Sequence, residues 1–243
     1  DHNIAIGYYA LNVTTAASSI AIGRESLKAL TSGGGNIGIG FQSLTALTTG
    51  TDNIAIGYAA LQVADGAEDN NVVIGTGAGM SINNDASDDN VFIGTYAGKG
   101  GTGQLDNNVA IGHLAMDATG GDAQSGTVAI GSSALTALTT GIGNTAVGYL
   151  ALDAATTDDY NTAIGYQSLS SVTGTNNNYN TAVGYNSGLA VTTGTYNTLL
   201  GSGAADSMTV GDKNTAVGSL TMAQITTGDI QGCVAIGYRA LLG

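Results

Sequence analysis

The chain has 243 residues, of which 39 are glycine, none is proline or tryptophan, and only 9% are charged. Eighteen acidic residues against five basic ones give a net charge of −13, and this excludes nucleic-acid binding because such a surface repels phosphate backbones. The single cysteine, Cys233, excludes a disulfide scaffold and a cysteine-based zinc site. No apolar run reaches the roughly 18 residues of a membrane span, so we expect no membrane insertion.

One short unit recurs along the whole chain: Asn, a β-branched residue, usually Ala, an aliphatic residue and Gly. The fourteen glycines that end the unit are Gly7, Gly23, Gly40, Gly57, Gly75, Gly94, Gly112, Gly131, Gly148, Gly165, Gly184, Gly201, Gly218 and Gly237. The first and last lie 230 residues apart, so the thirteen steps average about 17.7 residues. This regularity predicts one continuous repeat array over residues 1–243, without a domain boundary or linker.

The three residues before each glycine predict a β-strand, because the first is β-branched in all fourteen copies and the third is always aliphatic. After the glycine we expect a corner, a second short strand around a recurrent Leu, and a loop. That Leu occupies Leu11, Leu27, Leu44, Leu61, Leu135, Leu152, Leu169 and Leu241. Stacked at the ~4.8 Å spacing of strands, about 14 such coils form an all-β parallel β-solenoid roughly 60 Å long.

Alternation along each strand places its first and third residues on one face and its middle residue on the other. We interpret the first and third residues as buried, which leaves the middle one outward. The middle residue is alanine at Ala5, Ala21, Ala55, Ala110, Ala129, Ala146, Ala163, Ala182, Ala216 and Ala235. An unbroken outward apolar stripe is typical of an interface, so the pattern predicts a homo-oligomer. Alternatively, loops of the same chain cover the stripe.

The segments Asn53 to Leu61 (Asn-Ile-Ala-Ile-Gly-Tyr-Ala-Ala-Leu) and Asn144 to Leu152 (Asn-Thr-Ala-Val-Gly-Tyr-Leu-Ala-Leu) represent the repeat. The repeat resembles the head repeats of trimeric autotransporter adhesins, and more closely the longer repeats of bacteriophage tail-fibre proteins. The resemblance covers the whole chain. It implies a left-handed parallel β-roll, three chains around a common axis, and an extracellular role as a fibre shaft or host-facing head.

The sequence offers no catalytic, cofactor-binding or metal-ligating residue, and we expect no enzymatic activity. A Ser-His-Asp set needs a base oriented at a unique place, whereas repeats supply many equivalent serines and aspartates. His113 stands where six copies carry tyrosine after the glycine, so we interpret it as a surface substitution. Those tyrosines are Tyr8, Tyr58, Tyr149, Tyr166, Tyr185 and Tyr238.

Asn precedes the strand in eleven copies and predicts a stacked amide ladder, with ligand binding as the alternative. These residues are Asn3, Asn36, Asn53, Asn71, Asn90, Asn108, Asn144, Asn161, Asn180, Asn197 and Asn214. Acidic residues gather just before them, at Asp69, Asp88, Asp89, Asp106, Asp158, Asp159 and Asp212. Two interpretations stay open for these acids: a calcium site, or solvated charges that oppose aggregation.

Thr begins the strand in five successive copies, Thr145 to Thr215. Outward paired Thr columns are typical of ice-binding solenoids, but we expect these residues to face inward. The pattern as a whole favours a non-enzymatic, rigid oligomeric shaft of an extracellular fibre, from a phage tail fibre or a surface adhesin. Two alternatives are a receptor-binding module whose Tyr and Asp/Asn loop ladders recognise a glycan, and a filament subunit that stacks head to tail.

Overall fold

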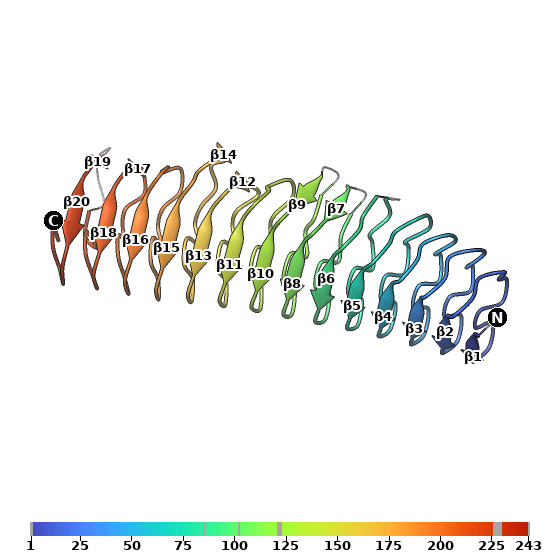
Figure 1. Cartoon of the computed structure of the whole chain (residues 1–243). Coiled ribbons are helices and arrows are strands. Elements are labelled where there is room, and N and C mark those ends of the chain that lie inside the picture. Colours follow the sequence, from blue (N-terminus) through green and yellow to red (C-terminus); the bar gives the residue numbers. More distant parts are fainter. Residues whose placement is uncertain (1, 85, 102, 121–122, 226–229, 243) are drawn as a thin grey trace. The chain divides into compact units, whose positions relative to one another are not determined.

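The computed structural model describes residues 2–84, 86–101, 103–120, 123–225 and 230–242. These residues form strands and turns without any helix, and so none that could cross a lipid bilayer. The chain divides into two compact units: unit 1, Asp1–Gly126, and unit 2, Thr127–Gly243. Parallel strands stack as a β-solenoid of about 12 turns, against about 14 predicted (Figure 1), which confirms the all-β parallel β-solenoid.

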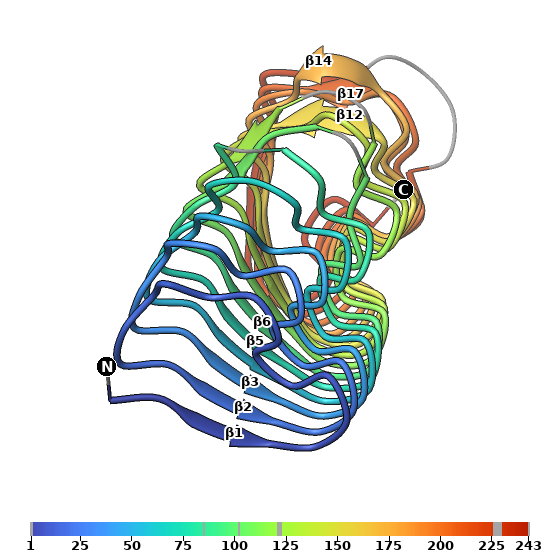
Figure 2. The same cartoon turned by 90° about the vertical axis from the view of Figure 1, so that its right-hand side faces the viewer.

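Unit 1 stacks seven strands of three residues each. In stacking order they are β1 Ile4–Ile6, β2 Ile20–Ile22, β3 Ile37–Ile39, β4 Ile54–Ile56, β5 Val72–Ile74, β6 Val91–Ile93 and β8 Val109–Ile111. A separate pair of two-residue strands, β7 Leu105–Asp106 and β9 Gln124–Ser125, lies in the loops. The register is uniform, since Ile37 pairs with Ile54 and Gly38 with Ala55. Each residue therefore stacks on its own repeat position in the next turn (Figure 2).

Unit 2 repeats the arrangement with seven strands and two loop pairs. The stacked strands are β10 Val128–Ile130, β11 Thr145–Val147, β13 Thr162–Ile164, β15 Thr181–Val183, β16 Thr198–Leu200, β18 Thr215–Val217 and β20 Val234–Ile236; the loop pairs are β12 Thr157–Asp159 with β14 Thr175–Asn177 and β17 Gly211–Asp212 with β19 Ile230–Gln231. The seven stacked strands of each unit, fourteen in all, coincide with the three positions predicted before each glycine.

The buried face of the strands is the opposite of the predicted one. Ala55 and Ala146, at the middle position, are completely buried, whereas Ile54 and Ile56 on either side of Ala55 are half-exposed. The same pattern holds in unit 2, where Ala182 is buried and Val183 is exposed. The prediction of inward flanking columns and an outward alanine stripe is therefore wrong.

The physical reason is the narrow space between each strand and the corner that follows a strand. A Cβ on Gly38, a middle residue, would lie 3.2 Å from Leu27 Cγ and 2.6 Å from Ser26 Oγ. The corner also bonds the strand directly, because the Ser43 hydroxyl donates to the Ala55 carbonyl at 2.8 Å. At this distance only a small middle residue fits opposite a buried leucine.

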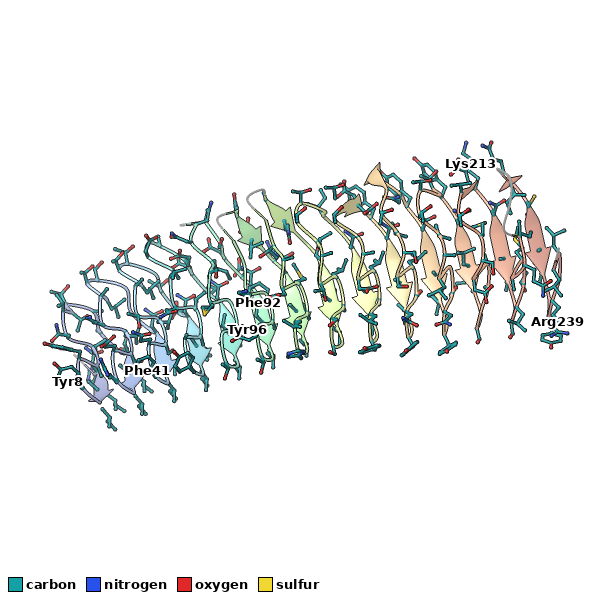
Figure 3. All side chains as sticks on the ribbon, turned by 180° about the vertical axis from the view of Figure 1, so that it is seen from behind. Tyr8, Phe41, Phe92, Tyr96, Lys213 and Arg239 are labelled. Carbon is teal, nitrogen blue, oxygen red and sulfur yellow. The ribbon has the colours of Figure 1, made fainter. Side chains whose placement is uncertain are left out.

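Two turns of unit 1 reverse the sizes of the facing residues. Phe92 replaces the middle alanine and is fully buried (Figure 3), and Gly98 stands where most turns carry leucine. A Cβ on Gly98 would lie 2.6 Å from the Phe92 ring. In the preceding turn Val73 faces Gly79 in the same manner. The exchange at Phe92 and Gly98 keeps the core volume nearly constant, and both pairs show that the middle position points inward.

The second short strand expected after the glycine is absent from the described residues, where the chain instead forms a turn. Gln42 and Leu44 both have positive φ, 55° and 51°. The Gln42 N–H donates to Arg24 O in the preceding turn at 3.0 Å, and the Leu44 N–H donates to Ala60 O in the following turn at 3.1 Å. This corner is therefore hydrogen-bonded to the turns before and after it, although it is not a strand. The Leu44 side chain is buried in the core.

Candidate functional site

A long regular surface is the outward side of the stacked strands, which we call the outer sheet face: the first and third residue of each of the seven stacked strands of unit 1 and the seven of unit 2. All these residues are Ile, Val, Leu or Thr, and in the inner turns most are half-exposed. In unit 1 both columns are aliphatic. The strands of unit 1 therefore present an apolar surface two side chains wide, which is unusual for an isolated soluble chain.

Unit 2 differs in its first column, where five successive strands begin with threonine. These residues are Thr145, Thr162, Thr181, Thr198 and Thr215, and they are half-exposed. The expectation that they face inward is wrong, because the middle residue of each strand is the buried one and the first residue therefore points outward. Their neighbouring outward column is aliphatic, as at Val147 and Val217, so the face lacks the paired threonines typical of ice-binding solenoids.

A first aromatic stack, the after-strand ladder, occupies the position after the repeat glycine. In unit 2 it consists of Tyr149, Tyr166 and Tyr185, whose ring centroids are 5.4 and 5.2 Å apart. In unit 1, Phe41 stacks on Tyr58 at 5.3 Å, and the Arg24 guanidinium lies 5.5 Å from the Phe41 ring. Figure 3 shows Tyr8 and Phe41 on the same edge of unit 1. This column was predicted from the sequence.

His113 lies in the same after-strand column and is exposed, in agreement with its interpretation as a surface substitution. His2 is also exposed. Within the described ranges, neither imidazole forms a hydrogen bond to a serine or a carboxylate. The parts of the chain that the structure describes also contain no group of three His, Cys, Asp or Glu side chains placed to hold a metal ion.

A second aromatic stack, the before-strand ladder, was missed by the sequence analysis. It consists of Tyr160, Tyr179 and Tyr196, each directly before the Asn that precedes a strand, with centroids 5.2 and 5.1 Å apart. All three residues have positive φ, 56°, 51° and 57°. For an L-residue with a bulky side chain this region costs roughly 1–2 kcal/mol, while a stacked aromatic pair contributes about 0.5–1.5 kcal/mol. The two stacked pairs therefore offset only part of the strain of three residues.

The asparagine column is a buried structural ladder, as predicted. The Asn71 side chain donates to the Ser87 carbonyl at 2.8 Å and to Asn53 Oδ1 at 3.1 Å. Its own Oδ1 accepts the Asn90 backbone N–H at 3.1 Å. Each amide thus satisfies buried backbone groups of its own and neighbouring turns, and its polar atoms are occupied rather than offered to a ligand.

Most of the predicted acidic cluster forms a third ladder, two residues before the Asn. Asp88 Oδ1 accepts the Asp69 N–H at 2.7 Å, and Asp106 Oδ1 accepts the Asp88 N–H at 3.3 Å. In unit 2, Asp159 and Asp212 accept N–H groups from the preceding turn at 2.7 Å. Burial raises the pKa of the Asp88 carboxyl, and the charges of neighbouring aspartates add to this rise. These carboxylates connect turns, a role that neither sequence interpretation foresaw.

Asp158 differs from the other acids because its side chain is buried. Its Oδ2 accepts the Thr156 N–H at 3.3 Å. Burial raises the pKa of this carboxyl to about 6, although the hydrogen bonds from Thr156 and Asn178 oppose the rise. Unit 2 therefore contains a buried acid whose charge changes under mildly acidic conditions.

No known protein family, curated protein or solved structure matches this chain. The outer sheet face, the two tyrosine ladders and the aspartate ladder are therefore the features from which a function is argued. All four are periodic surfaces or connections, and periodic arrays of equivalent groups suit mechanical and binding roles.

Proposed function

We propose that this chain is a non-enzymatic structural segment of an extracellular fibre, of the phage tail-fibre or surface-adhesin type, in which copies pack through the outer sheet face. The observation that carries the proposal is the outer sheet face, which is aliphatic in both columns of unit 1 and in the second column of unit 2. The resemblance of the repeat supplies the number of chains, three, and the left-handed coil. The extracellular location in this proposal rests on the same resemblance.

The energetics support this assembly. Complete burial of a fully exposed Ile or Val side chain contributes about 1.5–3 kcal/mol, so a residue that is already largely buried gains roughly 0.5 kcal/mol in an interface. Each unit offers two residues from each of seven stacked strands, of which five are Thr in unit 2. The gain is then on the order of 5 kcal/mol per unit and copy, at the lower end of the estimated 4–15 kcal/mol cost of association. Two units together reach about the middle of that range.

The mechanical role follows from the continuous connections between turns. Backbone hydrogen bonds, the asparagine ladder and the aspartate ladder join each turn to the next within each unit. A stack of this kind resists bending because any bend must break several in-register bonds at once. Surface columns can vary without loss of these bonds, so the same scaffold can present different side chains along its length.

The test is the mass of the native assembly by light scattering or sedimentation equilibrium. We expect three chains per particle, and a single-chain mass for the variant Ile39→Glu/Ile56→Glu with an unchanged circular dichroism spectrum. Both substituted residues are outward and half-exposed, so the single chain tolerates the charges. Val63→Glu, on an exposed residue outside the outer sheet face, is the matched control and should leave the mass unchanged. A wild-type mass of one chain would refute the proposal.

A further inference from the structure

The first column of the outer sheet face changes character within unit 2, and it does so abruptly at both ends. Five successive stacked strands begin with threonine, whereas the strands on either side, β10 and β20, begin with Val128 and Val234. The five residues, which we call the threonine block, are Thr145, Thr162, Thr181, Thr198 and Thr215. Each pairs in register with the next, so the block is one continuous column of half-exposed side chains.

The hydroxyl groups of the threonine block are not used by the fold. Across the described part of the chain, none of the five donates or accepts a hydrogen bond. Threonines in the loops differ, since the Thr139 hydroxyl donates to Thr156 O at 2.9 Å. Valine fills the position of the block in β10 and β20, so a β-branched side chain meets the needs of the strand without a hydroxyl. The single chain therefore gives these hydroxyls no role.

The rest of the outer sheet face offers the hydroxyls no partner either. The other column of unit 2 contains only Ile, Val and Leu, as at Val147 and Val183, and both columns of unit 1 contain only Ile and Val. When copies pack through this face, the hydroxyls leave water, and a buried hydroxyl without a hydrogen bond costs far more than one that has a partner. The only polar side chains that two such faces bring to the contact are the threonines of the block.

The block also carries information about alignment that the aliphatic columns lack. In unit 1 the third residue of all seven stacked strands is isoleucine, so a shift of one copy along another by one turn brings like side chains together again. The same shift of the threonine block places one hydroxyl of each copy opposite a valine, Val128 or Val234. Each further turn adds another unpaired hydroxyl. A polar residue in an apolar contact fixes alignment in this manner, at some cost in affinity.

We infer that the threonine block aligns copies of the chain: the five threonines of one copy meet the same five threonines of another, turn by turn, and their hydroxyls exchange hydrogen bonds. The outer sheet face of unit 1 supplies affinity without alignment, and the block supplies alignment. The inference rests on the proposed fibre role, because it requires copies to pack through the outer sheet face. It adds which residues select the matching segment of the partner copy.

Disulfide cross-linking of the full chain tests whether the threonine columns of two copies meet. The natural Cys233 is replaced by Asn, which eleven turns carry at this position, and Thr181→Cys is added at the centre of the block. A disulfide requires Cα atoms within about 7 Å. We expect a cross-linked pair in most assemblies after oxidation. Val210→Cys, on an exposed residue of unit 2 outside the outer sheet face, is the matched control and should cross-link at least tenfold less.

Co-expression of two cysteine variants tests the alignment. Copies with Thr162→Cys are combined with mass-tagged copies that carry Thr198→Cys, both without Cys233. The two positions are two turns apart, roughly 9.6 Å at the strand spacing, which exceeds the reach of a disulfide. Aligned copies should therefore form pairs of like variants at least tenfold more often than mixed pairs.

Removal of the other threonines should release the alignment. With Thr145→Val/Thr181→Val/Thr215→Val added to both copies, we expect mixed pairs to increase at least fivefold. The variant should fold, because Val128 and Val234 occupy the same column naturally. Ile22→Val/Ile39→Val/Ile56→Val in unit 1 is the matched control: it alters three outward aliphatic residues and should leave mixed pairs rare.

Light scattering on the same samples separates this inference from the proposed fibre role. An assembly of three chains that gives no cross-link through Thr181→Cys would overturn the inference and leave the fibre role intact. So would an assembly in which mixed pairs stay equally rare after the valine substitutions. A single-chain mass for the wild type would overturn both.

Discussion

In unit 1 both columns of the outer sheet face are aliphatic and the loops carry the ladder of Asp69, Asp88 and Asp106. In unit 2 the first column becomes threonine and tyrosines stack beside the strands. The framework is nevertheless the same: parallel strands in register, a buried middle residue and a buried asparagine ladder. Positions that join turns are thus constrained throughout, whereas outward columns change from one region to the next, and recognition belongs to those columns.

The largest expected effect is a loss of stability caused by substitutions in the core of unit 1. Phe92→Ala should destabilise unit 1 by about 3–5 kcal/mol, because the buried ring leaves a cavity beside Gly98. Gly98→Leu alone should also destabilise it, since the new side chain meets the Phe92 ring. The double variant recreates the alanine and leucine found in turns such as that of Ala55 and Leu61, and should recover at least half of the loss. Leucine is tolerated at this φ, because Gly98 has 51° and Leu61 49°.

Chemical denaturation followed by circular dichroism measures the three variants of this cycle. Ala129→Gly in unit 2 is a useful reference, because it changes the same core column without altering unit 1. Strictly additive effects of Phe92→Ala and Gly98→Leu would contradict the facing arrangement of the two side chains.

Much of the fold could be predicted from the sequence because stacking in register turns a sequence repeat directly into a spatial one. Strand positions, register and the asparagine ladder followed from columns of like residues. Alternation, however, shows only which residues share a face and not which face is buried. The exchange of Ala and Leu for Phe92 and Gly98 was the available signal for the buried face, since compensating sizes occur only where side chains meet.

The candidate site was less accessible to sequence reasoning. The after-strand ladder was recognised from its recurrent tyrosines, but the before-strand ladder was not, because Tyr160, Tyr179 and Tyr196 were not aligned as a column. Gly, Asp or Asn fill eight positions of that column, including Gly35, Asp52 and Asn107. These residues accept positive φ and could have indicated a left-handed position. Stacking itself depends on turn geometry that no single repeat reveals.

A medium effect on stability is expected from pH, and mainly in unit 2, because the pKa of Asp158 is raised further than that of Asp88 in unit 1. The pKa of Asp158 is raised to about 6 by burial, while the unfolded carboxyl titrates near 3.9. Folding therefore favours the protonated form: its stabilisation is complete below about pH 4 and is lost as the pH rises through about 6. Unit 2 should melt at a higher temperature at pH 4.5 than at pH 7.5, beyond any change common to both units.

Thermal melting of Asp158→Asn checks this expectation, because the amide keeps the shape of the side chain and cannot ionise. The variant should lose most of the pH dependence of unit 2 and should be more stable than the wild type at pH 7.5. Asp65→Asn, on an exposed residue of unit 1, is the control for the reduced net charge. An identical pH response of wild type and Asp158→Asn would rule out the buried acid as its source.

The smallest expected effect on stability comes from substitutions that give the first column of each outer sheet face the residues of the other unit. Thr162→Val/Thr181→Val/Thr198→Val gives unit 2 the aliphatic face of unit 1, and these half-exposed changes should alter single-chain stability by about 0.5 kcal/mol or less each. If copies pack through this face, each exchange removes a hydroxyl that would otherwise be buried against apolar groups, so the assembly should dissociate at a lower concentration in the variant than in the wild type. Val72→Thr/Val91→Thr/Val109→Thr in unit 1 should act in the opposite direction, because it buries three more hydroxyls. Sedimentation equilibrium measures both dissociation constants, and opposite shifts are required: changes of the same sign would mean that these residues affect the fold of each chain and not the contact between chains.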